Sequence, residues 1–376
     1  MSTSQQPPEI QPLRLLALDG GGMKGLTSLL TLRQLMLQLK RDVTDPDEPI
    51  PRPCDVFDLI GGTSTGGLIA IMLGRLGMTV TSTVFGKKKA FGIGRTMFSG
   101  SMYETKDLQT AIKTLVAERL KQERVPFRAD TDNTSAANTI TAAREDQAVH
   151  ASSSLSGEAA QDPEDAPLND VRADLSRFVC ATRNKTFNYE LIRNYTSGKP
   201  DQVDYDCTIW EAGSATAAAP MFFGPVTFQQ SKAKFSDGGT TINCPLPEVV
   251  NEARRLWNSP QFACIVSLGT GWPANPKVKS GLLGSLGQTF KVLTDAQKKY
   301  EGWVRGNRDD LNIKDRYFRF NVEQGTDQLK LDEWEETEEM TALTDSYLGQ
   351  DKQMNEVERC VKLLRTTDAA NESAQS

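Results

Sequence analysis

The sequence predicts an α/β fold, a three-layer α/β/α sandwich with a mostly parallel or mixed central sheet. Short apolar segments typical of strands alternate along the chain with segments whose apolar residues recur at helical spacing. The strand-like segments are apolar throughout, as in sheets that helices cover on both faces. Two glycine-rich turns each follow a predicted strand and precede a predicted helix. These observations favour repeated strand, turn and helix units.

The first of these units occupies the start of the predicted domain. LRLLAL, Leu13 to Leu18, is short and apolar, and LTSLLTLRQLMLQL, Leu26 to Leu39, repeats apolar residues at helical spacing. A second strand is predicted over VFDLIGG, Val56 to Gly62, and the LIAIML segment that follows it is apolar enough to be a buried helix. The sequence therefore begins with two successive strand and helix pairs.

Four further strands are predicted after residue 170. They are RFVCAT (177 to 182), AKFSD (233 to 237), FACIVSL (262 to 268) and YFRF (317 to 320). KQMNEVERCVKLLR has the pattern of an amphipathic closing helix. We expect a single domain over residues 13–365 and a flexible tail over 366–376.

One segment inside the domain has a different composition. Residues 129–169 are rich in Ala, Ser, Thr, Asp, Glu and Gln, with hardly any large apolar side chains. Such a segment buries too little surface to offset its ordering entropy, so a disordered insertion is predicted there. It contains His150, the single histidine of the chain.

Charge and cysteine content exclude several classes of protein. The 376 residues carry a net charge of −6, which gives no global attraction to nucleic acid or to anionic membranes. Contact with lipid would have to be local, as at Lys87 to Lys89, whose simpler interpretation is a solvated face. The six cysteines are dispersed and no secretory or membrane-spanning segment is apparent, so we expect a soluble, cytoplasmic protein.

The DGGGMKG turn, Asp19 to Gly25, lies between the first predicted strand and helix. Bare backbone N–H groups at a helix N-terminus attract a negative oxygen. Gly20, Gly22 and Gly25 also match the dinucleotide-binding pattern, which expects an acidic residue about twenty positions further on. Asp42 and Asp45 lie near that spacing but in a polar loop. The turn alone thus indicates an anion without naming it.

The GGTSTGG turn follows the second predicted strand. Gly62, Ser64 and Gly66 form a nucleophile elbow, in which small neighbours let the chain turn sharply and hold a serine hydroxyl above the sheet. The strand before it and the helix after it strengthen the assignment of Ser64 as a nucleophile.

The partner of Ser64 is less clear from the residues. Because His150 lies in the predicted insertion, a Ser-His-Asp triad is disfavoured and a carboxylate or lysine is expected as the base. Asp237 of KFSDGG is the best candidate, at the end of a strand and before two glycines. Its simpler interpretation is a hairpin turn. Asp19, Asp55 and Asp58 also neighbour the glycine motifs, so the choice stays open.

DGGGMKG, then GTSTGG, then DGG far downstream resemble the three blocks of the patatin-like phospholipases. IWEAGSATAAAPMFFGPV (209 to 226) and VSLGTG (266 to 271) are also similar to that family. The similarity covers roughly residues 13–272, and it is strongest to fungal members. After DGG the chain reads TTINCP, where the family often has an Asn-rich turn.

This resemblance implies a serine lipid acyl hydrolase with a patatin-like fold. It implies that Ser64 is the nucleophile, that Asp237 is its base, and that Gly20, Gly21 and Gly22 form the oxyanion hole. Lys24 falls where the family carries a basic residue, often arginine, and its charge would support an anion. A larger residue at Gly21 is expected to depress turnover and leave folding largely intact.

The resemblance also implies partners and cofactors. The substrate would be a phospholipid or another lipid ester, met by transient contact with a membrane surface, and no metal or other cofactor would be required. Nucleic acid is not an expected partner, and the oligomeric state is open. A catalytically inactive interaction module is the alternative, with DEWEETEE (332 to 339) as a possible partner surface, and a nucleotide-binding protein is a weaker one.

Overall fold

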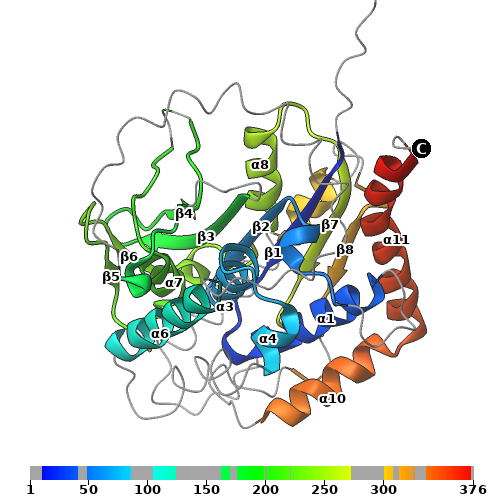
Figure 1. Ribbon diagram of the computed structural model, residues 1–376, viewed down its shortest axis with the longest axis horizontal. Helices are drawn as coiled ribbons and strands as arrows, with labels where there is room; N and C mark the ends of the chain where they lie inside the picture. Colours follow the sequence, from blue (N-terminus) through cyan, green and yellow to red (C-terminus); the bar gives the residue numbers. More distant parts are fainter. Residues whose placement is uncertain are drawn as a thin grey trace, which may run out of the picture.

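The computed structural model has a central sheet with helices on both faces, so the predicted α/β sandwich is confirmed (Figure 1). The described residues are 11–40, 49–85, 105–123, 162–169, 176–198, 200, 202–220, 222–271, 300–307, 313–322, 325–326 and 336–373. None of the helices within these ranges is long and apolar enough to cross a membrane.

Eight strands form one mixed sheet, in the order β5-β6-β3-β2-β1-β7-β8, with β4 also paired to β3. The parallel strands are β1 (Leu13–Leu18), β2 (Leu59–Thr63), β3 (Ser176–Arg183), β7 (Phe262–Leu268) and β8 (Tyr317–Phe320). Antiparallel pairing adds β4 (Tyr189–Arg193) and β6 (Lys234–Asp237) to β3, and β5 (Val226–Thr227) to β6. The carboxyl ends of the parallel strands therefore share one edge of the sheet.

Side chains that alternate along each strand build a core on both faces of the sheet. On β1, Leu16 and Leu18 join one buried cluster, whereas Leu15 and Ala17 join the other. The first cluster lies under α1 (Gly25–Gln38), α3 (Thr65–Ala70), α7 (Ile209–Ala217) and α11 (Asp351–Ser373). The second lies under α8 (Leu246–Leu256) and the helical residues 300–307.

The remaining elements are short or peripheral. They are α2 (Pro53–Val56), α4 (Val80–Phe85), α6 (Thr105–Glu123), α10 (Thr337–Leu348), a π-helical turn (Ile71–Arg75) and the 3₁₀ turns Gly22–Lys24, Pro163–Asp165 and Gly238–Thr240. In Figure 1, α6 and α10 lie at opposite ends of the lower layer of helices.

Three of the predicted strands match the structure at both ends. β1, β7 and β8 have the predicted bounds. The strand predicted from Val56 begins three residues too early, because Pro53 starts a helical turn that holds Val56. The sequence analysis did not find β4, in which Tyr189 is exposed and Glu190 is half-buried, or β5, which has two residues.

The predicted insertion extends too far at its C-terminal end. Residues 162–169 are placed, and Ala166 and Leu168 are buried in the core. The Trp210 indole N–H donates to the Asp165 carboxylate at 2.9 Å, which fixes this segment against α7. These two apolar side chains are enough to anchor a short segment of polar composition. Residues 129–161, with His150, lie outside the described residues.

The predicted tail is also shorter than expected. Helix α11 continues to Ser373, so the boundary set at residue 366 falls inside it. Val357, Cys360 and Leu364 are buried against the sheet, which explains why the helix forms where it does.

Candidate active site

Ser64 occupies the sharp turn between β2 and α3. Its φ of 55° and ψ of −124° are rarely adopted by a residue with a side chain. The glycines on either side permit this turn: a Cβ on Gly62 would lie 2.1 Å from the Gly66 carbonyl oxygen, and one on Gly66 would lie 2.2 Å from that of Leu18. The turn leaves Ser64 partly exposed at the carboxyl edge of the sheet.

Strand β3 brings Asp237 to Ser64. Thr63 of β2 pairs with Cys180, and Asp237 of β6 pairs with the next residue, Ala181. β4 pairs with residues 178–182 of β3, a range that overlaps the residues paired with β2 and also those paired with β6. β4 therefore occupies one edge of β3, and β2 and β6 lie end to end along the other edge. Gly238 permits the close approach, since a Cβ there would lie 2.3 Å from the Cys180 carbonyl oxygen.

The Ser64 hydroxyl donates a hydrogen bond to the Asp237 carboxylate, with Oγ 2.6 Å from Oδ2. The other carboxylates that the sequence left open have different partners. Asp58 accepts from the Arg14 backbone N–H, Asp55 pairs with Arg52 at the surface, and Asp19 pairs with Arg319. Of these four carboxylates, Asp237 alone contacts Ser64.

Asp237 is buried, with 4% of its surface exposed. Burial raises the pKa of its carboxyl to about 6, because a charged carboxylate loses hydration there; the hydrogen bonds from Ser64 and from the Gly239 N–H oppose this rise. The Gly239 nitrogen lies 2.6 Å from Oδ1. A carboxylate with this pKa is a stronger base than an ordinary aspartate and is still ionised at neutral pH.

Thr216 of α7 holds the backbone of Ser64. Its hydroxyl accepts the Ser64 N–H at 2.9 Å and donates to the Cys180 carbonyl at 2.7 Å. The side chain is fully buried, and a Cβ on Gly67 would meet it at 2.6 Å. Thr216 therefore links the turn at Ser64 to Cys180 of β3. The next residue of β3, Ala181, is the one that pairs with Asp237.

The DGGGMKG loop follows β1 at the same edge of the sheet. The Gly20 N–H donates to the Asn243 carbonyl at 3.0 Å, which differs from the expectation that all three glycines point donors at an oxyanion. Among the hydrogen bonds of the described residues, the N–H groups of Gly21 and Gly22 have no acceptor. Gly22 has a φ of 57°, which glycine adopts without strain.

Two side chains hold this loop through the Gly20 carbonyl. Thr270 Oγ1 donates to it at 2.7 Å and Asn243 Nδ2 at 3.2 Å. A Cβ on Gly21 would lie 2.1 Å from Thr270 Oγ1, so a larger residue there must displace this anchor. Whether such a variant keeps its fold, as expected above, stays a prediction. The sequence analysis quoted the segments that contain Thr216, Asn243 and Thr270, but nothing local indicated what these residues contact.

Lys24 and Asp19 have partners that fix the ends of the loop. The buried Lys24 ammonium donates to the Thr326 carbonyl at 2.6 Å, a neutral partner that ties the loop to residues 325–326. Asp19 Oδ2 accepts from Arg319 Nη2 at 2.6 Å. The support of an anion by Lys24 stays a prediction, and the lipid contact considered for Lys87 to Lys89 lies outside the described residues.

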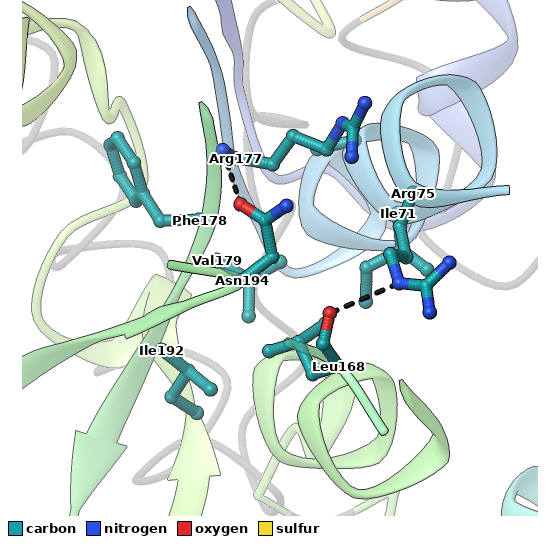
Figure 2. Close-up of a pocket in the computed structure, with 9 residues that line it drawn as sticks. Ile71, Arg75, Leu168, Arg177, Phe178, Val179, Ile192 and Asn194 are labelled. Carbon is teal, nitrogen blue, oxygen red and sulfur yellow. Dashed lines mark hydrogen bonds between the residues drawn. The ribbon is translucent and has the colours of Figure 1, made fainter. Parts of the chain in front are cut away.

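Two cavities lie away from Ser64 and Asp237. The one in Figure 2 holds about 10 Å³, room for about one water, between α3, β3 and β4, with the Arg75 guanidinium donating to the Leu168 carbonyl at its edge. The other, about 300 Å³, is bordered by Arg319, Tyr347 and Lys352. Neither has Ser64 or Asp237 in its lining. The described residues include no group of three His, Cys, Asp or Glu side chains that could hold a metal ion.

Comparison with known proteins identifies the family. The family described as patatin-like phospholipase matches residues 16–250, more than half of the chain and the part that holds Ser64, Asp237 and the DGGGMKG loop. The chain belongs to the patatin-like phospholipase family. The resemblance to this family is thus confirmed. The greater similarity to its fungal members stays a prediction.

Relatives with the patatin-like domain come from distant organisms. The chain is 27% identical over 327 residues to the calcium-independent phospholipase A2-gamma of Rattus norvegicus, covering 82% of this chain and 35% of the relative. It is 25% identical over 346 residues to patatin-like phospholipase 1 of Plasmodium falciparum, covering 83% and 43%. It is 26% identical over 358 residues to phospholipase A I of Arabidopsis thaliana, covering 86% and 25%.

Among solved structures, VipD from Legionella pneumophila matches with a TM-score of 0.39 and 15% identity, over 90% of this chain and 67% of VipD. The chain spans about a third of the length of the calcium-independent phospholipase relatives that it matches. Their names therefore describe longer proteins.

Proposed function

We propose that the protein is a serine lipid acyl hydrolase that cleaves ester bonds of phospholipids or other lipid esters. The observation that carries the proposal is the 2.6 Å hydrogen bond from Ser64 Oγ to a buried carboxylate whose pKa burial raises to about 6. Membership of the patatin-like family and relatives named as phospholipases support the choice of a lipid ester.

In acylation, Ser64 Oγ attacks the ester carbonyl carbon as Asp237 takes the hydroxyl proton. The N–H groups of Gly21 and Gly22 donate to the oxygen that becomes negative in the tetrahedral intermediate. The intermediate collapses, the bond to the leaving alcohol breaks, and Asp237 returns the proton to that alcohol. Ser64 then carries the acyl group as an ester.

In deacylation, a water molecule attacks the acyl-enzyme carbonyl and gives its proton to Asp237. Collapse of the second intermediate releases the fatty acid, and the proton returns to Ser64 Oγ. Every proton in this cycle moves between Asp237, Ser64, the alcohol and water. We therefore propose that turnover does not need a divalent cation. The name of the rat relative describes that protein as calcium-independent.

The test is fatty-acid release from mixed phospholipid vesicles in the presence of a chelator. We compare the native chain with Ser64→Ala and Asp237→Asn, each checked for folding by circular dichroism. Release by the native chain and loss of about 10³-fold or more in both variants is the expected result. Ser28→Ala is the matched control, because the Ser28 hydroxyl donates to the Gly269 carbonyl and does not contact Asp237.

Native release that stops with the chelator would contradict metal independence. Full activity in folded Ser64→Ala would contradict the nucleophile. A native chain that hydrolyses neither phospholipids, neutral lipids nor soluble esters would favour the inactive interaction module. Nucleotide binding through the loop is disfavoured, because it gives no role to the contact between Ser64 and Asp237.

Location and partners follow from the same proposal. We propose a cytoplasmic protein that touches membranes transiently, since the substrate is a lipid and since the six cysteines are free thiols, five of them buried. Nucleic acid is not proposed as a partner of this acidic chain.

A further inference from the structure

Phe187 lies at the tip of the β3–β4 hairpin, where its backbone N–H closes the turn by donating to the Arg183 carbonyl at 2.8 Å. Its side chain is 77% exposed, and its φ is 53°, in the left-handed region that favours glycine. An aromatic residue at such an angle is a strained outlier, and exposing the ring to water adds a second cost. The turn accounts for this angle, but it does not require an aromatic side chain at the tip.

The hairpin extends from the carboxyl edge of the sheet. Arg183 ends β3 two residues beyond Ala181, the partner of Asp237, and the turn to Phe187 follows directly. β1 and β2 run parallel to β3 and place the glycine loop and Ser64 at the same edge. The exposed ring therefore belongs to the side of the molecule on which the candidate active site opens.

Basic side chains surround this tip. Lys185 is exposed in the same turn, and Lys232 and Lys234 are exposed on the β5–β6 hairpin. The two hairpins are joined, because the Asn184 N–H donates to the Lys234 carbonyl at 3.0 Å. The Arg183 guanidinium pairs with Glu190 at 3.8 Å, whereas those three lysines have no ion-pair partner within the part of the chain that the structure describes. The hairpins are locally basic in a chain of net charge −6.

A second aromatic side chain lies near the tip. Tyr189 is 41% exposed, and its hydroxyl donates to Glu248 at 2.9 Å, so the ring is held at the surface by its polar end. Exposed aromatic rings beside lysines are typical of the boundary between headgroups and acyl chains.

We propose that the two hairpin tips, defined by Phe187, Tyr189, Lys185, Lys232 and Lys234, dock on the surface of an anionic phospholipid bilayer. The Phe187 ring enters the boundary between headgroups and acyl chains, and the lysines contact lipid phosphates. The inference rests on the proposed function for its biological meaning, because docking there presents the carboxyl edge of the sheet to lipid. Binding itself needs no turnover.

The experiment measures sedimentation with vesicles. The full chain carries Ser64→Ala, and the vesicles are phosphatidylcholine alone or phosphatidylcholine with phosphatidylserine. We expect binding to the anionic vesicles that weakens with salt. Phe187→Gly should lower the partition coefficient about tenfold, since one aromatic side chain is withdrawn from apolar surroundings. Lys185→Gln and Lys234→Gln should each lower it about fivefold.

Matched controls lie on α11, where Met354 is 45% exposed and Lys352 is exposed. Met354→Ala and Lys352→Gln should bind like the parent chain. Phe187→Gly removes a strained angle, so its melting temperature should be equal to or above that of the parent. A loss of binding with a preserved melting temperature is therefore not a loss of folding.

Unchanged vesicle binding by Phe187→Gly would overturn the proposal. So would a parent chain that binds neither kind of vesicle, which would point to a protein partner for the tips. If the tips bind vesicles but the chain with Ser64 intact releases no fatty acid, the proposed function fails and the docking surface stands.

Discussion

At the scale of single residues, the proposed reactivity of Ser64 depends on the burial of the Asp237 carboxylate. Burial opposes its ionisation, and two short hydrogen bonds at its oxygens partly compensate. The result is a carboxylate that gains basicity from lost hydration and remains ionised above pH about 6. The same burial costs folding free energy, so the proposed role of Asp237 as a base and the stability of the fold make opposite demands on this residue.

The pKa of Asp237 predicts the acid limb of the activity profile. Only the ionised carboxylate can take the proton of Ser64, so kcat/KM should fall with decreasing pH below about 6, approaching tenfold per pH unit. The measurement is hydrolysis of a soluble short-chain ester across the pH range in which the chain stays folded. Activity that stays constant down to pH about 4 would contradict Asp237 as the base.

The raised pKa also predicts how Asp237→Asn changes stability. The folded protein binds this proton more tightly than the unfolded chain, whose carboxyl keeps a pKa near 3.8, so raising the pH from about 4 to 6 destabilises the native fold. Asp237→Asn removes that penalty and should be more stable at neutral pH by up to about 3 kcal/mol. The gain should vanish near pH about 4. Urea unfolding at both pH values measures it, and equal stabilities at neutral pH would contradict the buried charge.

Thr216 predicts a separation of turnover from stability. Thr216→Val keeps the shape but leaves the Ser64 N–H without its acceptor, so kcat should fall about 10- to 100-fold with little change in KM. Thr216→Ser keeps the hydroxyl and should keep kcat, although the lost methyl lowers the melting temperature. Equal kcat losses in both variants would mean that Thr216 only fills space.

At the scale of elements, the sequence predicts structure well where the signal is local. β1 and β7 are buried on both faces and could be read as strands directly from their composition. The nucleophile elbow was also predictable, because its glycines, strand and helix are contiguous. β5 was missed because a strand of two residues is too short to show an alternation of apolar and polar side chains. β4 was missed because its first residue, Tyr189, is exposed and its second, Glu190, is only half-buried.

The candidate site shows the limit of local signals. Asp237 was one of several acidic residues beside glycines, and only its register on β3 distinguishes it. Likewise, the Gly20 N–H is engaged by Asn243, which lies 223 positions further along the chain. Such contacts depend on pairing between distant segments, which composition and spacing do not encode.

At the scale of the whole molecule, a buried ion pair joins the two ends of the domain. Asp19 directly follows β1 and Arg319 lies on β8, 300 positions further along the sequence. Arg319 also donates to the Ser267 hydroxyl on the intervening β7. The pair thus spans three neighbouring strands directly behind the glycine loop.

This pair predicts a large loss of stability when one partner is removed. Arg319→Met leaves the buried Asp19 carboxylate uncompensated and should lower the free energy of unfolding by about 3–5 kcal/mol. Adding Asp19→Asn should recover part of that loss in a double-mutant cycle followed by urea unfolding. Arg359→Met, in a half-exposed pair with Glu356, is the matched control and should have little effect. Additive losses would contradict the coupling.

The end-to-end arrangement of β2 and β6 along β3 has a consequence for how the protein can change. Ser64 and Asp237 are 173 positions apart in the sequence. The distance between their side chains is set by β3, where Thr63 pairs with Cys180 and Asp237 pairs with the next residue, Ala181. That distance is independent of the length of chain that connects them. Evolution or design can therefore lengthen, shorten or exchange the connecting segments while the distance between these two side chains is kept.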